Sequence, residues 1–386
     1  MDKELQGRTN QPILAILTTD DEERLFRGNH KNFVDLIRTG SSKNVLVYVI
    51  TYKELDPSST RVLGYVYDFQ KKSWKQQMLP TPHVVYNRIP FRKDEIKAEV
   101  QEKIQSCLQN PRMELFNPFF FNKWTLFEWL NQAKLTKKYI PSTSKLSAPK
   151  DLENLLKKYN LLYLKPELGK AGKGIMRIEH IHEKKGANVQ NPSIRLSIQE
   201  KKKSQIHTYN NLVEVWKQVS EFIHEKEYIA QQGIQLTSYN NRPFDLRILV
   251  QKNNRGEWEI SGVGARIAGK TSITTHVPRG GSIDDPDKLL TASFGKNKSK
   301  IMLRRVNKAA LTIAQQIEKK SHYMLGEMSI DLGIDENGRI WFFEANSKPM
   351  KFDEPSIRQK SLEQLIQYTK YIANKKTVKS NITFID

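Results

Sequence analysis

The chain has 386 residues, a formal net charge of +21 and a hydrophobic content of 38%. This length predicts an α/β assembly of two or three connected lobes. The 6 Trp, 14 Tyr and 16 Phe argue against a disordered chain, because each ring can bury a large apolar area. The only cysteine, Cys107, excludes an intramolecular disulfide framework and a Cys-rich zinc module.

The excess of positive charge favours a polyanionic partner, such as a nucleotide, a nucleic acid, an acidic peptide or an acidic polymer. The lysines are spread along the chain, with no arginine-rich block, zinc-finger spacing or RNA-recognition aromatic motif. Nucleic acid is therefore not the favoured partner. The N-terminal MDKELQGRTNQ lacks an apolar h-region, and no apolar stretch is long enough for a membrane span. These features predict a soluble, cytoplasmic protein.

Three lobes are expected, over residues 1–115, 116–225 and 226–386. Alternating and continuous apolar runs predict the first as a small α/β lobe, with strands at Pro12–Thr18, Asn44–Ile50 and Val84–Arg88, a hairpin at Leu63–Leu79, and helices near Asn32–Arg38 and Asp94–Leu108. A further helix is expected at Trp124–Ala133, and Pro141 marks a change of pattern.

The middle lobe is expected to contain a Pro-started helix at Pro149–Tyr159, strands at Leu161–Lys165 and Ile175–Glu179, a Lys-rich hairpin around Ile194–Ile206 and a helix near Asn210–Phe222. The last lobe is expected to have strands at Tyr228–Gln231, Leu246–Gln251, Trp258–Ala268, Met328–Leu332 and Arg339–Glu344, with helices at Met302–Lys319 and Ile357–Ala373.

A glycine-rich loop lies between two predicted strands, in the sequence KPELGKAGKGI from Lys165 to Ile175. Its three glycines allow the backbone to close over phosphates, and Lys165 and Lys173 supply positive charge. It is not a P-loop, because the GxxxxGK[ST] spacing is absent and a strand follows. Taken alone, a Gly- and Lys-rich hairpin turn explains the pattern about as well.

Acidic and amide side chains mark the last predicted hairpin, whose turn is Asp335 to Gly338. Asp331 and Glu344 can meet across the two strands, and Asn346 projects to the same face as Glu344. Two carboxylates and an amide oxygen suit Mg²⁺, which also retains waters and substrate phosphates as ligands. Ordinary hairpin polarity is the alternative, but facing carboxylates repel each other unless a cation lies between them.

A third group of polar residues is Phe244-Asp245-Leu246-Arg247 at the start of a predicted strand. The Arg247 guanidinium suits two phosphate oxygens, and Asp245, two residues away, is expected to position it or a ribose hydroxyl. A structural Asp–Arg pair is the competing interpretation. Arg266 adds a second cation, and Arg279-Gly280-Gly281 adds a turn that can bend towards an anion.

The order of these motifs resembles the ATP-grasp superfamily, and within it the YheC/YheD-like group named for association with the endospore coat. The resemblance rests on KPxxGxxGKGI, QQGI, FDLR, RGG, and Asp331 followed by ExN, between Pro141 and Pro349. It implies an ATP-grasp fold in which two α+β lobes grip the nucleotide, after a small N-terminal lobe.

The same resemblance implies roles for individual residues. Lys165, Arg247 and Arg266 would hold phosphate oxygens during catalysis. The cofactor-binding set would be Lys165, Gly169, Gly172, Lys173, Gly174, Gln231, Gln232, Gly233, Ile234, Asp245 and Arg247. Asp331, Glu344 and Asn346 would bind Mg²⁺ or Mn²⁺. Three positions depart from the family pattern: Lys170 in the loop, Gln232 in the QQGI segment and His276 before the Gly-Gly turn.

The implied activity is phosphoryl transfer from ATP to a carboxylate, followed by attack of an amine on the acylphosphate. The basic surface favours an acidic peptide or polymer as substrate, and the family name suggests a role in sporulation. Two rival hypotheses stand beside it: a non-catalytic ATP-binding structural or regulatory spore-associated protein, and a basic nucleic-acid-binding protein with salt-dependent affinity.

Overall fold

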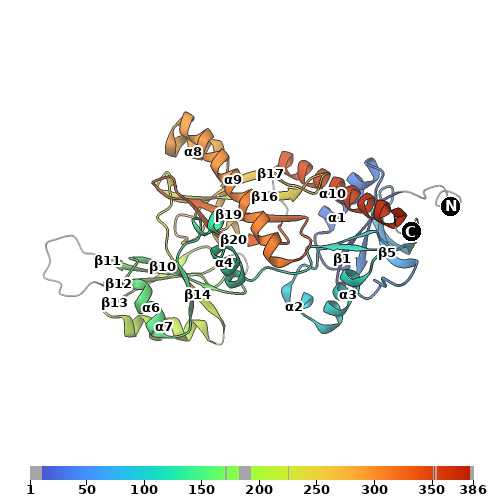
Figure 1. Ribbon diagram of the computed structural model, residues 1–386. Helices are drawn as coiled ribbons and strands as arrows, with labels where there is room; N and C mark the ends of the chain where they lie inside the picture. Colours follow the sequence, from blue (N-terminus) through green and yellow to red (C-terminus); the bar gives the residue numbers. More distant parts are fainter. Residues whose placement is uncertain are drawn as a thin grey trace.

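The computed structural model describes residues 11–169, 172–181, 193–224, 226–350, 352 and 354–382, with side chains as far as 375. Three large sheets organise these residues, and Figure 1 shows them arranged in one elongated molecule. No helix among the described residues is long and apolar enough to cross a membrane.

The N-terminal sheet is a mostly parallel one with an antiparallel hairpin at its edge. Its strands follow the order β6-β5-β4-β1-β7-β8. All six residues of β1 (Ile13–Thr18) are buried, because parallel neighbours β4 (Leu46–Thr51) and β7 (Val84–Asn87) flank it and helices cover the sheet. The other elements are β2 (Asp20–Asp21), β3 (Leu25–Phe26), α1 (His30–Ser42), β5 (Arg61–Asp68), β6 (Ser73–Pro80), α2 (Arg92–Glu95), α3 (Ala98–Gln109) and β8 (Glu114–Phe116).

The middle sheet is antiparallel, in the order β13-β12-β11-β10-β14-β9, with two helices on one face. Its strands are β9 (Thr143–Leu146), β10 (Leu161–Pro166), β11 (Met176–Ile181), β12 (Ser193–Gln199), β13 (Ser204–Tyr209) and β14 (Tyr228–Gln232). The helices α6 (Pro149–Leu156) and α7 (Leu212–Ile223) bury apolar residues against it. This lobe positions Lys165, the next-to-last residue of β10.

The C-terminal sheet is also antiparallel, in the order β18-β17-β16-β19-β20. Its strands are β16 (Arg242–Lys252), β17 (Trp258–Ile267), β18 (Ser282–Asp284), β19 (Glu327–Ile334) and β20 (Ile340–Asn346), with β15 (Ser238–Tyr239) pairing to β16. One face buries Leu246, Ile248 and Ile330 in the same apolar core as α9 (Lys296–Ser321). The opposite face is therefore free to carry polar residues.

The remaining elements pack around and between these sheets. They are α4 (Lys123–Asn131), α5 (Lys134–Lys137), the short 3₁₀ turn η1 (Val277–Arg279), α8 (Pro286–Phe294) and α10 (Pro355–Ile382). In Figure 1, α10 runs beside both α1 and the C-terminal sheet, and it contacts α1, β1, β16 and β17. The end of the chain thus packs between the first and last lobes.

Two predicted lobe assignments were wrong. The strand predicted at Tyr228–Gln231 was expected in the last lobe, but as β14 it pairs with β10 and β9 in the middle sheet, because its backbone fills the place between those strands. The α4 helix was expected in the middle lobe, but Leu126, Phe127 and Leu130 are buried in the C-terminal core. Its apolar face thus covers the last sheet.

The predicted helix from Asp94 to Leu108 is divided into α2 and α3, with Lys97 in an extended conformation between them. This break lets the carboxylate of Glu95 reach the N–H of Phe120 (2.8 Å) and the ammonium of Lys348. Glu95 thereby contacts both the interlobe segment and the end of the last sheet.

Candidate active site

Strand register places the polar residues of the C-terminal sheet in two adjacent rows on one face. In the first row, Arg247 lies opposite Asp331, which in turn lies opposite Glu344. In the second row, Asp245 lies opposite Arg266. Directly paired residues of antiparallel strands project to the same side. The predicted proximity of Asp331 and Glu344 is confirmed by this register.

Arg266 links the two rows by binding two buried carboxylates. Its Nε and Nη2 donate to Asp245 at 2.9 and 2.8 Å, and Nη2 lies 2.9 Å from Asp331 Oδ2. Burial alone would lower the pKa of Arg266, but the charges of Asp245 and Asp331 outweigh it and raise that pKa. Thr275 also donates to Asp245 Oδ2 at 2.6 Å.

The expected positioning of Arg247 by Asp245 is wrong. Asp245 is occupied by Arg266, because the register of β16 and β17 brings these two side chains together. Arg247 instead donates to the hydroxyl of Ser329 at 3.1 Å and lies over the ring of Phe352. Its guanidinium has no carboxylate at ion-pair distance among the described residues.

The carboxylates of Asp331 and Glu344 suit a hard cation. Asp331 Oδ1 is buried and has no hydrogen-bond partner among the described residues, although Oδ2 of the same group pairs with Arg266. A buried carboxylate oxygen without a donor is costly unless a ligand fills its place. Burial would raise the pKa of Asp331, but Arg266 and Arg247 lower it overall, so that the group is a carboxylate at neutral pH.

No group of three or more His, Cys, Asp or Glu side chains is gathered for a metal in the described part of the chain. A site of two carboxylates and an amide is nevertheless enough for Mg²⁺, which is usually bound through one or two carboxylates and substrate phosphates. Asp331 and Glu344 fit that requirement, and Asn346 lies on the same strand as Glu344, two residues further on.

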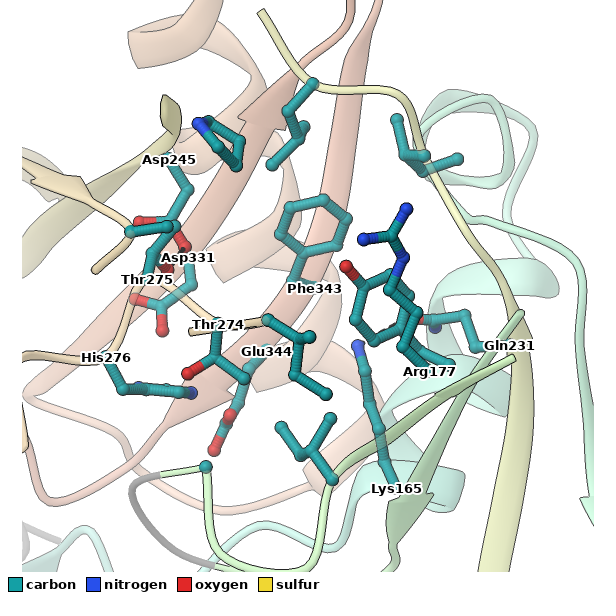
Figure 2. Close-up of a pocket in the computed structure, with 18 of the residues that line it drawn as sticks. Lys165, Arg177, Gln231, Asp245, Thr274, Thr275, His276, Asp331, Phe343 and Glu344 are labelled. Atoms are coloured by element: carbon teal, nitrogen blue, oxygen red, sulfur yellow. Dashed lines mark hydrogen bonds between the residues drawn. The ribbon is translucent and has the colours of Figure 1, made fainter. Parts of the chain in front are cut away.

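Lys165 and the two carboxylates line one cavity of about 410 Å³ between the middle and last lobes. Figure 2 shows Lys165 entering from β10, with Asp245 and Asp331 on the other wall and Phe343 and Glu344 between them. The Lys165 ammonium donates to Gln231 Oε1 at 2.6 Å. Burial lowers the pKa of Lys165 to about 8, with Glu344 acting in the opposite direction.

Lys123 is a second lysine at this site, and it belongs to none of the sequence motifs described above. It begins α4, where Asn122 caps the helix by accepting from the N–H of Thr125 at 3.1 Å. Its ammonium lies 3.6 Å from Glu344 Oε1 and donates to the carbonyl of Gly169 at 3.2 Å. The helix cap was the only local signal, because the lysine reaches the cavity through tertiary packing.

Aromatic, apolar and amide side chains line the rest of the cavity. They are Tyr163, Ile175, Gln231, Gln232, Ile234, Leu236 and Phe343. Aromatic and aliphatic walls with backbone polar groups suit a planar heterocycle. Gly233 lies behind this wall: a Cβ there would stand 2.2 Å from Leu161 Cγ, and the Gly233 N–H donates to the Leu161 carbonyl at 2.7 Å.

Described residues of the glycine-rich loop also line the cavity. Gly169, Gly172 and Lys173 line it, whereas Lys170 lies outside the described residues. Gly174 does not line it, and its carbonyl accepts a hydrogen bond from Tyr228 at 3.0 Å. Gly172 has a φ of +70°, and a Cβ there would stand 2.8 Å from the His276 ring.

His276 is half-buried beside Gly172 of the loop and lies near Arg266, Glu344 and Asp331. Burial is the largest cause that lowers its pKa, and Arg266 acts in the same direction. At neutral pH the ring is therefore neutral, and it contributes shape to the cavity wall rather than charge.

A second cavity, of about 1410 Å³, adjoins the first and reaches the N-terminal lobe. The two cavities share Lys123, Gly169, Arg266, His276 and Glu344 in their walls. Arg247 and Asn346 line this second cavity and not the first. The predicted site residues are therefore divided between two connected spaces that meet at Glu344.

Residues 112–372 match the model of the family described as YheC/D like ATP-grasp. The chain belongs to this family. It is 25% identical over 373 residues to the endospore coat-associated protein YheD of Bacillus subtilis (strain 168), covering 94% of this chain and 79% of that protein.

Solved structures of ATP-grasp ligases share the fold of this YheC/D-like protein. The D-alanine–D-alanine ligase of Coxiella burnetii matches with a TM-score of 0.51 at 12% identity, covering 96% of this chain and 98% of the ligase. The ATP-grasp ligase PsnB, in complex with a phosphomimetic variant of its minimal precursor, Mg and ADP, matches with a TM-score of 0.50 at 10% identity and covers 94% and 99%. The expected ATP-grasp fold is thus confirmed.

Proposed function

We propose that this YheC/D-like ATP-grasp protein is an ATP- and Mg²⁺-dependent carboxylate–amine ligase that acts through an acylphosphate. The observation that carries the proposal is the single cavity in which Lys165 and Lys123 face Asp331 and Glu344. The lysines suit the phosphates of a nucleoside triphosphate, and the carboxylates suit its bound metal.

In this proposal, adenine packs against the apolar side chains that line the cavity, such as Ile234 and Leu236. The phosphates extend towards Lys165 and Lys123, which neutralise their charge. Gly169, Gly172 and Lys173, which line the cavity, would limit the access of water, which would otherwise hydrolyse an acylphosphate.

Asp331 and Glu344, with Asn346, would hold Mg²⁺ or Mn²⁺. When bound, the metal would neutralise the charge on the phosphate oxygens. The chain's own contribution is to fix the two carboxylates in register and to keep Arg266 charged beside them. Arg266 is therefore placed to stabilise negative charge that develops during transfer.

The substrate carboxylate would enter through the second cavity, which meets the first at Glu344, Arg266 and His276. One carboxylate oxygen attacks the γ-phosphorus and the bond to ADP breaks. An amine then attacks the acyl carbon of the mixed anhydride, loses a proton and displaces inorganic phosphate. No covalent enzyme intermediate is needed.

The deciding experiment measures nucleotide binding and turnover for the wild type and Glu344→Gln, with an untargeted mass-spectrometric search for the ligated product. We expect ADP and phosphate to form only with the wild type and a suitable carboxylate and amine. Glu221→Gln, the same change on an exposed position of α7, is the control and should behave as the wild type.

The relative's name supports a further proposal, that the protein associates with the spore. ATP binding without ADP formation across a broad panel of carboxylates and amines would favour a non-catalytic structural or regulatory role instead. Steeply salt-dependent binding of DNA or RNA, without effect of Glu344→Gln, would favour the nucleic-acid hypothesis.

A further inference from the structure

The second cavity is too large for the small carboxylates that many enzymes handle. Its volume of about 1410 Å³ exceeds the range of roughly 300–1,000 Å³ that is common for small-molecule sites. It runs from Glu344 at the reacting end to Arg24 and Trp74 in the N-terminal lobe. A ligand that filled it would span two lobes.

The charge of this cavity is strongly positive. Eight lysine and arginine side chains line it, against the three acidic residues Glu23, Glu344 and Glu354. Arg88, Lys348 and Arg266 are each paired with a buried carboxylate. Arg24, Lys93, Arg92 and Arg247 have no carboxylate at ion-pair distance among the described residues.

These four cations are spread along the cavity rather than gathered at one point. Arg247 lies on β16 in the last lobe, whereas Arg92 and Lys93 lie on α2. Arg92 is held in place by the carbonyls of Phe120 and Phe121, at 3.2 and 2.6 Å. Separated cations favour a ligand with several separated anions, because a ligand with one carboxylate can form an ion pair with only one part of the cavity.

The wall and mouth of the cavity also carry apolar groups. Six of the chain's exposed large hydrophobic side chains line it: Leu25, Phe91, Leu168, Val277, Ile283 and Met350, of which Met350 is 65% exposed and Leu168 58%. Exposed apolar residues that gather around one opening are typical of a binding surface. A uniformly charged polymer, such as a polyphosphate, has no apolar groups to cover these side chains.

We infer that the second cavity binds an extended peptide with several Asp or Glu side chains among apolar ones, and that one of these carboxylates is the group that ATP phosphorylates. Only the second part, the phosphorylation of a peptide carboxylate, rests on the proposed ligase function. The peptide-binding part stands on the unpaired cations and the apolar mouth.

The test uses the full-length protein and a fluorescein-labelled peptide of about twelve residues with repeating Glu, Leu and Ser, whose binding is followed by fluorescence anisotropy. A second peptide has Gln in place of each Glu, and a third is oligoglutamate of the same length. We expect the mixed peptide to bind at least about tenfold more tightly than either control, because only it supplies both anions and apolar groups.

Two sets of variants map this binding to the cavity. Arg24→Gln combined with Lys93→Gln should raise the Kd of the mixed peptide about three- to tenfold, since both exposed cations line the cavity. Met350→Ser should raise it about threefold by removing apolar contact. The matched control, Arg304→Gln with Lys217→Gln, removes two exposed cations from α9 and α7 and should leave it unchanged.

Equal binding of the Glu and Gln peptides, or an unchanged Kd in the Arg24/Lys93 variant, would overturn the inference. If oligoglutamate binds as tightly as the mixed peptide, the ligand is an acidic polymer rather than a peptide with apolar side chains, and the inference is wrong. Binding of a fluorescent ADP analogue is measured beside each titration. Failure to bind this analogue, with peptide binding intact, would contradict the ligase proposal and leave the peptide site in place.

Discussion

A single arginine sets the electrostatics of the site, because Arg266 is the only described cation that contacts both Asp245 and Asp331 at salt-bridge distance. All three side chains are buried, with exposed fractions of 6% or less. Buried ion pairs gain little over an apolar replacement, but the removal of one partner leaves charges that neither water nor protein compensates. The stability of the protein should therefore depend strongly on Arg266.

Arg266→Gln should lower the free energy of unfolding by about 3–5 kcal/mol, because it leaves two buried carboxylates without their cation. Urea unfolding followed by fluorescence measures this. Asp245→Asn in the Arg266→Gln background should recover part of the loss, since one uncompensated charge is removed. Arg304→Gln, on the exposed side of α9, is the matched control. A loss no larger than that of the control would contradict the assignment.

Lys165 predicts a pH dependence of nucleotide binding. Burial lowers its pKa to about 8, so half of the lysines are neutral near that pH in the free protein, and bound phosphates favour the protonated form. The affinity for ATP should therefore fall about three- to tenfold as the pH rises from about 7 to about 9, with proton uptake on binding.

Isothermal titration calorimetry in buffers of different ionisation enthalpy measures this proton uptake. Lys165→Gln should remove both the uptake and most of the affinity, whereas Lys217→Gln, an exposed lysine on α7, should change neither. Uptake that persists in Lys165→Gln would assign the titration to another group.

At the scale of elements, local signals predicted much of the fold. The hairpin of β19 and β20 was predicted from Asp335 and Gly338, and both take the roles that a turn requires: Asp335 accepts from Arg339 N at 2.8 Å, and Gly338 has a φ of +76°. The opposition of Asp331 and Glu344 followed from that hairpin.

Other contacts depended on pairing between distant strands and could not be predicted from local patterns. Asp245 and Arg266 meet because β16 and β17 pair in one particular register, which a one-residue shift would abolish. Lys123 reaches Glu344 because α4 packs on the last sheet rather than on the middle one. Such contacts are set by tertiary packing, for which a single sequence carries little signal.

Gly172 in the glycine-rich loop gives a prediction about nucleotide binding. Gly172→Ala should weaken nucleotide binding about fivefold or more, because a side chain is strained at a φ of +70° and its Cβ would clash with His276 across the cavity. The measurement is the Kd of a fluorescent ADP analogue.

Gly256→Ala provides the control, since Gly256 has a φ of +72° and a Cβ there would stand 2.5 Å from the ring of Tyr371, away from the cavity. This variant should lower the Tm and leave the Kd unchanged. Equal loss of affinity in both variants would attribute the effect to global destabilisation.

At the scale of the whole molecule, buried polar contacts join the first lobe to the last. The carboxylate of Glu327 in β19 accepts from Tyr86, from Arg88 at 3.3 Å and from Gln251 at 3.0 Å. Glu95 in α2 pairs with Lys348, which follows Asn346 by two residues. The N-terminal lobe thus holds the strand end that carries Glu344 and Asn346.

This arrangement predicts that Lys348→Met, although outside the nucleotide cavity, should both destabilise the protein and weaken Mg²⁺-dependent nucleotide binding. The loss of stability is expected to be about 3 kcal/mol, because Glu95 is left buried without its cation. A double-mutant cycle with Glu95→Gln should give a coupling of about 1–3 kcal/mol, with the double variant more stable than the sum of the single changes predicts.

Lys53→Met is the control. It breaks the exposed Lys53–Asp20 pair of the N-terminal lobe and should change neither the stability nor the nucleotide binding. If Lys348→Met lowers the Tm but leaves the Kd for Mg²⁺ and ADP unchanged, the first lobe supports the fold without positioning the site.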